Sequence, residues 1–246
     1  DFLTARTFGA TVRLVPTAWT AQSATGVQSV EPRDPRALAF AIREALRERS
    51  ADLTAAVKVG MLPDAAAASA VAEALADFDG AIVFDPVLAA SSGGVLFTGD
   101  LAALVALGAR ATLFTPNAVE AGAFAGTKLR ALADAETTAA LLCARGLPAV
   151  LVKGGHLEDM PGEAVDVLAR APQGGGVGQT TLVRHFRTRR IPGPAVRGTG
   201  CALATAIAVG LGRGLALEQA ISEGKAWLTV ALAKPVAAGG EWHLGS

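Results

Sequence analysis

Residues 197–211 read Arg-Gly-Thr-Gly-Cys followed by Ala-Leu-Ala-Thr-Ala-Ile-Ala-Val-Gly-Leu. Gly198 and Gly200 let the backbone turn tightly and approach a ligand closely. The apolar run after them predicts a buried helix that begins at this loop. Free N–H groups and the positive dipole end of such a helix form a site for an anion. The thiol of Cys201 lies where a helix start tends to lower its pKa, so the stretch indicates phosphoryl transfer.

A purely structural interpretation of the same stretch stays open. A glycine-rich turn often precedes a helix without binding a ligand, and a cysteine at a helix start is commonly a small buried side chain. The remainder of the chain has to decide between the two.

The composition limits the classes of protein to which this chain can belong. Of its 246 residues 51% are hydrophobic and 18% are charged, which excludes a disordered chain and predicts a sizeable core. The 22 basic and 22 acidic residues give a net charge of zero, which speaks against a nucleic-acid partner. We interpret the local basic cluster of Arg187, Arg189 and Arg190 as a solvated strand edge.

Cysteines, histidines and apolar runs exclude further classes. Cys143 and Cys201 are the only cysteines and form no CxxC pair, which speaks against a disulfide framework or a zinc site and favours a reducing cytoplasm. His156, His185 and His243 are scattered without metal-ligand spacing. No apolar run reaches membrane-spanning length and no signal peptide is visible, so we expect no membrane partner.

Short apolar, β-branched runs alternate with helical patterns along the first two thirds of the chain. Strands are predicted at Thr11–Pro16, Ala56–Val59, Ala81–Phe84, Ala111–Phe114 and Ala149–Val152. Helices are predicted at Pro35–Arg49, Pro63–Phe78, Asp100–Leu107, Asn117–Ala125 and Ala133–Ala144. This order predicts an α/β fold with a mostly parallel central sheet and helices on both faces.

The pattern changes between Ala164 and Ile191. Shorter strands are predicted around a glycine-rich turn, at Val165–Ala169, Thr180–Phe186 and Arg187–Ile191, and they indicate a small antiparallel edge. Two long helices then close the chain, at Cys201–Arg213 and Leu217–Lys234. We expect residues 1–246 to form one domain.

Polar residues follow several of the predicted strands. Asp85 follows the strand at 81–84, Asn117 and Glu120 follow the next one, and Lys153 ends the strand at 149–152. Ligands of open α/β sheets bind beyond the carboxyl ends of strands. Carboxylates there would hold Mg²⁺ directly or through water, Lys153 would neutralise phosphate charge, and the glycine loop at 198–200 would steady the transferred group.

Each of these residues also has a structural interpretation. Asp85 could cap a turn, and Asn117 could be a helix N-cap with Glu120 completing a capping box. Lys153 could point into solvent, and His156 could be a turn or core residue.

Together these motifs resemble the ribokinase-like superfamily, and within it the hydroxymethylpyrimidine/phosphomethylpyrimidine kinases of thiamine biosynthesis. The matching segments follow the family's order over nearly the whole chain. They are Gly198-Thr199-Gly200-Cys201, Thr115-Pro116-Asn117 with Glu120, Val152-Lys153-Gly154-Gly155-His156-Leu157, Thr20-Ala21-Gln22 with Thr25-Gly26-Val27-Gln28, Lys58-Val59-Gly60-Met61-Leu62, Asp85-Pro86-Val87 and Lys225-Ala226-Trp227-Leu228-Thr229.

The resemblance implies an ATP- and Mg²⁺-dependent phosphotransferase that phosphorylates a small hydroxymethylpyrimidine and then its monophosphate, and that forms a homodimer. It implies that Cys201 is the general base and that the backbone of 198–201 (Gly198, Thr199, Gly200, Cys201) forms the anion hole. For the other site residues it implies roles in binding the pyrimidine (Gln22, Met61, Val87), the nucleotide (Lys153, Asn117, Gly155) and the metal (Asp85, Glu120).

The chain also departs from the family's pattern. The family begins with a strand and a glycine-rich segment that ends at the position of Asp1, and this segment is missing from the chain. Ser91-Ser92-Gly93 stands where Lys-Ser-Gly is usual, Arg197 stands where His is common, and Glu241-Trp242-His243-Leu244 replaces a Gly-His-rich ending. These changes bear on nucleotide contacts and substrate choice more than on the type of reaction.

Three alternatives remain at this stage. The chain could be a pyridoxal kinase of the same branch, against which Gln22 argues modestly. It could be a pyrimidine-binding relative without catalysis, which the missing segment suggests. It could also be a hydrolase with a cysteine nucleophile, although no histidine partner is recognisable in the sequence.

Overall fold

The fold is built on a six-stranded sheet, seen in a computed structural model that describes residues 1–23, 26–48, 55–90, 93–155, 157–171, 181–238 and 241–245. The strands lie side by side in chain order. They are β3 (Ala56–Val59), β4 (Ala81–Phe84), β5 (Leu113–Phe114), β6 (Ala149–Val152), β7 (Glu163–Arg170) and β8 (Leu182–Arg189). The first four are parallel, and β7 and β8 add an antiparallel edge.

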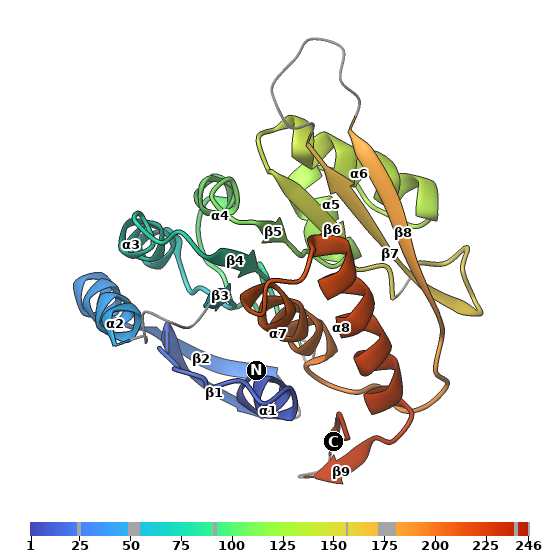
Figure 1. The fold of residues 1–246 in the computed structure, drawn as a ribbon, viewed down its shortest axis with the longest axis horizontal. Coiled ribbons are helices and arrows are strands. Elements are labelled where there is room, and N and C mark those ends of the chain that lie inside the picture. The colour runs from blue at the N-terminus through green and yellow to red at the C-terminus, as the bar shows by residue number, and fades with distance from the viewer. Residues whose placement is uncertain are drawn as a thin grey trace.

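Helices cover both faces of this sheet (Figure 1). One layer consists of α2 (Pro35–Arg47), α3 (Ala65–Ala74), α4 (Leu101–Gly108), α5 (Ala118–Ala125) and α6 (Leu132–Ala144). The other consists of α7 (Thr199–Gly212) and α8 (Leu217–Leu232), which pack against each other. The predicted fold class, a mostly parallel sheet between helices with a small antiparallel edge, is therefore confirmed.

Successive side chains along the strands point to opposite faces of the sheet, so the core has two parts, one on each face. Phe84 and Phe114 point to the α2–α6 layer, where Phe114 makes edge contacts with Phe84 and with Phe124 of α5. Val83 and Leu113 point to the α7–α8 layer. Strands buried on both faces are near-continuously apolar, which is the pattern that the sequence shows.

Side chains at the helix starts explain where several helices begin. Asp34, Asp64 and Asp100 each accept a hydrogen bond from a backbone N–H in the first turn of α2, α3 and α4. Such caps satisfy amide groups that have no partner within the helix. The helix predicted at Pro63–Phe78 is α3, which begins after its cap Asp64 and ends at Ala74.

Two small hairpins and a short helix complete the described structure. They are β1 (Ala18–Ser23) with β2 (Gly26–Pro32), β9 (Val236–Ala238) with β10 (Glu241–His243), and α1 (Phe2–Thr7), which packs on α7. The β1–β2 hairpin is tied to the main body where Thr17 Oγ1 donates to Met61 O at 2.7 Å and Val27 N donates to Gly93 O at 3.3 Å.

The predicted strand at Thr11–Pro16 is wrong, because this segment has no regular structure. Its alternation of apolar and polar residues resembles a strand, but Leu14 is 62% exposed and no strand among the described residues pairs with the segment. A strand requires a partner, which a local pattern does not reveal. The two strands expected at 180–191 are one continuous strand, β8, paired with β7 along its whole length.

Among the described residues, no helix is long and apolar enough to cross a membrane.

Candidate active site

The polar residues that follow β4, β5 and β6 meet at the carboxyl edge of the sheet. Asp85 N donates to Val59 O at 2.9 Å, and Lys153 N donates to Pro116 O at 2.9 Å. Asn117 and Lys153 form a parallel β-bridge. The N-terminus of α7 reaches the same place from the other layer, since a Cβ on Gly200 would lie 3.0 Å from Lys153 Nζ.

The centre of the site is a buried ion pair between Asp85 and Lys153. Lys153 Nζ lies 2.5 Å from Asp85 Oδ1, and the two side chains are 11% and 1% exposed. Burial alone would raise the pKa of Asp85, but the charges of Lys153 and Lys58 outweigh burial and hold that pKa below its usual value. Burial would lower the pKa of Lys153, but Asp85 and Glu120 outweigh it and raise that pKa. Both groups are therefore charged at neutral pH.

A second lysine, Lys58, extends this pair into a chain of alternating charges. Its ammonium lies 2.7 Å from Asp1 Oδ2 and 4.0 Å from Asp85 Oδ2. Asp1 Oδ1 in turn accepts a hydrogen bond of 2.8 Å from Thr205 Oγ1 on α7. A Cβ at position 60 would lie 2.8 Å from Lys58 Nζ, so glycine there leaves room for the ammonium.

Sequence reasoning assigned no role to Lys58 or Thr205. Lys58 is the one charged residue within the apolar strand β3, and a charge in a strand expected to be buried was the available signal. Thr205 lies in the middle of an Ala-rich helix and carries no such signal.

Cys201 lies beside this cluster in the first turn of α7. The preceding Gly198 has φ +74°, in the left-handed region that favours glycine. The predicted lowering of the Cys201 pKa is wrong, because burial and the negative charge of Asp85 raise it to about 11, although Lys58 and Lys153 pull it down. The effect of the helix N-terminus is outweighed because the half-buried thiolate would lose part of its hydration and would lie next to a carboxylate.

Asn117 and Glu120 form the capping box that was their structural interpretation. Asn117 Oδ1 accepts from the N–H groups of Val119 and Glu120, both at 2.9 Å, and Glu120 Oε2 accepts from Asn117 N at 2.7 Å. Glu120 is 5% exposed, and burial raises its pKa although Lys153 acts in the opposite direction. Although Glu120 caps α5, its carboxylate also belongs to the site, because the charge of Glu120 raises the pKa of Lys153.

The two carboxylates fit a divalent cation. Asp85 Oδ2 is buried and has no hydrogen-bond partner within the described part of the chain. Glu120 supplies a second buried carboxylate, and its burial raises its pKa. The described residues contain no group of three or more His, Cys, Asp or Glu that could enclose a metal, so other ligands would have to complete the shell.

The residues expected to contact a pyrimidine come from three separate segments. Met61 and Val87 are half-buried and follow β3 and β4, whose ends are in register at Val59 and Phe84. Gln22 is exposed on β1, opposite Val27, at a bulge in the hairpin. Thr17, which precedes β1, anchors the hairpin to the segment after β3 through its hydrogen bond to Met61 O.

The loop after Lys153 is held by Arg190, which corrects the interpretation of that residue as part of a solvated edge. Arg190 donates to the carbonyl oxygens of Gly155, Met160 and Glu163. Gly155 is half-buried at this turn, and His156 lies outside the described residues.

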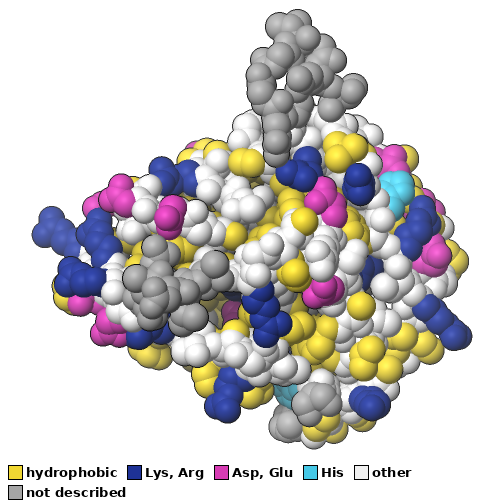
Figure 2. All heavy atoms as spheres, in the orientation of Figure 1, with side chains coloured by type: hydrophobic (Ala, Val, Ile, Leu, Met, Phe, Trp, Pro, Cys, Tyr) yellow, Lys and Arg dark blue, Asp and Glu magenta, His cyan; other side chains and the backbone are white. Residues whose placement is uncertain are grey.

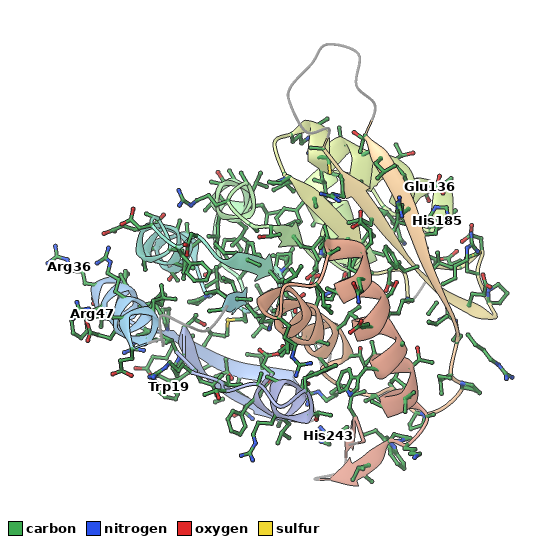
Figure 3. The ribbon with its side chains drawn as sticks, viewed as in Figure 1. Trp19, Arg36, Arg47, Glu136, His185 and His243 are labelled. Carbon is green, nitrogen blue, oxygen red and sulfur yellow. The ribbon has the colours of Figure 1, made fainter. Side chains whose placement is uncertain are left out.

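Away from this edge, the outer surface carries scattered charged side chains and two histidines that lie far apart. Basic and acidic side chains are interspersed over the described residues of the face in Figure 2. His185 on β8 lies with Nε2 2.7 Å from Glu136 Oε1 on α6, far from His243 at the C-terminal hairpin (Figure 3).

The raised pKa of Cys201 predicts slow alkylation at neutral pH. We expect the rate with iodoacetamide, followed by mass spectrometry of the Cys201 peptide, to rise steadily with pH toward about 11. Lys58→Met should slow the reaction at each pH and Asp85→Asn should speed it, because the first change removes a positive charge and the second a negative one.

Cys143 is the internal control. It is 5% exposed, and burial also raises its pKa to about 11. The charges of Lys58 and Asp85 do not contribute to that shift. A Cys201 thiol that is half-titrated near its ordinary pKa of 9.0 would contradict the prediction.

Comparison with known proteins agrees with this geometry. The profile of the phosphomethylpyrimidine kinase family matches residues 1–244. A hydroxymethylpyrimidine/phosphomethylpyrimidine kinase of Rhizobium meliloti is 36% identical over 224 residues, which are 89% of this chain and 78% of the relative.

Solved structures show the same fold. A phosphomethylpyrimidine kinase of Clostridium difficile has a TM-score of 0.71 at 27% identity, covering 94% of this chain and 90% of its own. A pyridoxal kinase of Bacillus subtilis in complex with ADP has a TM-score of 0.76 at 25% identity, covering 94% and 83%. The chain therefore belongs to the phosphomethylpyrimidine kinase family, a family of phosphotransferases with a ribokinase-like fold.

Proposed function

We propose that this protein uses ATP to phosphorylate 4-amino-5-hydroxymethyl-2-methylpyrimidine, and then its monophosphate, in thiamine biosynthesis. The observation that carries the proposal is the Asp85–Lys153 ion pair beside Cys201 at the start of α7. This edge combines fixed positive charge, carboxylates and the amide groups of a helix start, which are the parts that phosphoryl transfer requires. Membership of the kinase family supports the same activity.

Lys153, Gly155 and Asn117 are the residues that we assign to the nucleotide. Lys153 would neutralise phosphate charge, and the first-turn N–H groups of α7 at 198–201 would form the anion hole for the transferred phosphoryl group. The assignment is supported by the short distance between Lys153 and the start of α7, since a Cβ at position 200 would lie 3.0 Å from Lys153 Nζ. Asp85 and Glu120 would hold Mg²⁺, which would neutralise charge on the phosphates when bound.

Cys201 is the proposed general base for the first phosphorylation. Its sulfur would take the hydroxyl proton as the hydroxyl oxygen bonds to the γ-phosphorus, and the bond from that phosphorus to the β–γ bridging oxygen breaks to release ADP. Since the pKa of Cys201 is about 11 in the free protein, the thiolate is a minor form at neutral pH. Lys58 and Lys153 are the groups that favour this form.

The activity is tested by ADP release from purified protein with ATP and Mg²⁺ and with three acceptors: hydroxymethylpyrimidine, its monophosphate and pyridoxal. We expect turnover with both pyrimidines and poor turnover with pyridoxal. Pyridoxal as the best acceptor would make the protein a pyridoxal kinase. Binding of pyrimidine without turnover of any acceptor would favour the non-catalytic alternative.

Cys201→Ala tests the base in the same assay. We expect turnover of the alcohol to fall by about 10²–10⁴-fold, the range of general base catalysis. The monophosphate should lose less, because its attacking phosphate oxygen is already largely deprotonated at pH 7 and needs no base. Equal losses with both acceptors would contradict the assigned role.

Gln22→Met tests recognition of the pyrimidine. The loss of one hydrogen bond should raise KM for the pyrimidine about tenfold, equivalent to ~1.4 kcal/mol, and leave KM for ATP unchanged. The exposed position of Gln22 on β1 makes a change in folding an improbable cause, and a melting curve checks this. Unchanged pyrimidine kinetics would remove Gln22 from the site.

We further propose that residues 1–246 are a single kinase domain that works in the cytoplasm as a homodimer. The outer face of the β1–β2 hairpin supports a dimer contact, since Trp19 is 63% exposed there and points away from the body (Figure 3). Trp19→Glu should then shift sedimentation equilibrium from twice the chain mass toward the monomer. A wild-type protein that sediments as a monomer would contradict this proposal.

A further inference from the structure

A second buried ion pair lies behind the phosphate site and joins α8 to β7. Lys225 Nζ is 2.7 Å from Asp166 Oδ2, and the two side chains are 7% and 5% exposed. The other oxygen, Asp166 Oδ1, accepts a hydrogen bond of 3.0 Å from Gly154 N. Asp166 therefore uses one oxygen for the lysine and the other for the loop that follows Lys153.

This loop passes directly over β7. A Cβ at position 154 would lie 1.9 Å from Val165 O and 2.8 Å from a methyl group of Leu157, so only glycine allows this approach. Without a side chain of its own, Gly154 is held through its N–H group. Asp166 is the acceptor of that group.

The contact fixes the backbone on the C-terminal side of Lys153. On the N-terminal side, Lys153 N donates to Pro116 O at 2.9 Å. With both flanking amides held, the side chain of Lys153 starts from a fixed place and reaches Asp85 and Gly200. A hydrogen bond at Gly154 thus acts on the position of the ammonium that faces the phosphates.

Lys225 is the charged partner of Asp166 in this apolar setting. A buried carboxylate without a charged partner is costly, and its turning toward water would weaken its bond to Gly154. No other salt bridge is found for Asp166 within the described residues. Lys225 belongs to the Lys-Ala-Trp-Leu-Thr segment at 225–229, which the proposed reaction does not otherwise use.

We infer that Lys225 and Asp166 are positioning residues that set the phosphate affinity of the site through Gly154 and Lys153, without touching the substrates. This inference rests on the proposed function only in assigning phosphate to Lys153. It differs from a direct role of Lys225 in holding the nucleotide, because here the lysine acts only by neutralising Asp166.

The inference is tested by calorimetric titration of the full chain with MgADP and, separately, with hydroxymethylpyrimidine. Lys225→Met should weaken MgADP binding by about tenfold or more, in line with small displacements of a positioned group, and should change pyrimidine affinity less than about twofold. Adding Asp166→Asn to Lys225→Met should restore most of the MgADP affinity, since the asparagine carbonyl still accepts from Gly154 N and carries no charge. Adding Asp166→Ala instead should not restore it.

The ion pair between Arg170 and Glu218 provides a matched control. It joins the same two elements, β7 and α8, with Nη1 and Oε1 2.9 Å apart, but it makes no contact with the loop at 153–155. Glu218→Gln should leave MgADP affinity unchanged, and melting curves of all variants check that they are folded.

Three results would overturn the inference. An equal loss of MgADP affinity in Glu218→Gln would show that loosening of α8 is the cause. A double variant Asp166→Asn/Lys225→Met as weak as Lys225→Met alone would show that the lysine acts directly on the nucleotide. No MgADP binding by the wild-type protein would overturn this inference and the proposed function together. If the MgADP series behaves as expected but no pyrimidine is phosphorylated, only the proposed function fails.

Discussion

The contact between Lys153 and Asp85 is the constraint on which the rest of the site depends. Two charges that are 11% and 1% exposed are stable in a protein interior only when they are paired closely. Their pairing at 2.5 Å fixes the end of β6 relative to the end of β4, across the intervening strand β5. The positive charge of Lys58 lowers the pKa of Asp85, and the negative charge of Glu120 raises the pKa of Lys153.

The arrangement leaves the site ready for an anion and a cation at once. Asp85 Oδ2 has no hydrogen-bond partner within the described residues, and Glu120 has a raised pKa, so both favour an additional positive charge. Lys153 also faces the amide groups at the start of α7, where negative charge is favoured. ATP with a divalent metal ion, as we propose for this site, would bring both charges together.

The packing of α7 has a chemical consequence for Cys201. The helix is rich in alanine and glycine, and Ala204 and Ile207 are fully buried against the sheet. This close approach puts the half-buried Cys201 beside Asp85, and burial and that carboxylate raise the thiol pKa to about 11. A helix start that lowers a thiol pKa in water therefore fails to do so here, because burial and a neighbouring carboxylate contribute more.

The amino-acid sequence by itself determined the α/β class, the antiparallel edge and which polar residues lie at the carboxyl ends of strands. These follow from hydrophobic periodicity and from the order of elements, both of which are local properties. The strand expected at 11–16 failed for the same reason, because pairing with a neighbour is not local. Only the tertiary structure decided that Lys58 approaches Asp85 and that Lys225 supports Gly154 through Asp166. The position of each of these groups depends on neighbours far away in the chain, and only packing brings those neighbours within reach.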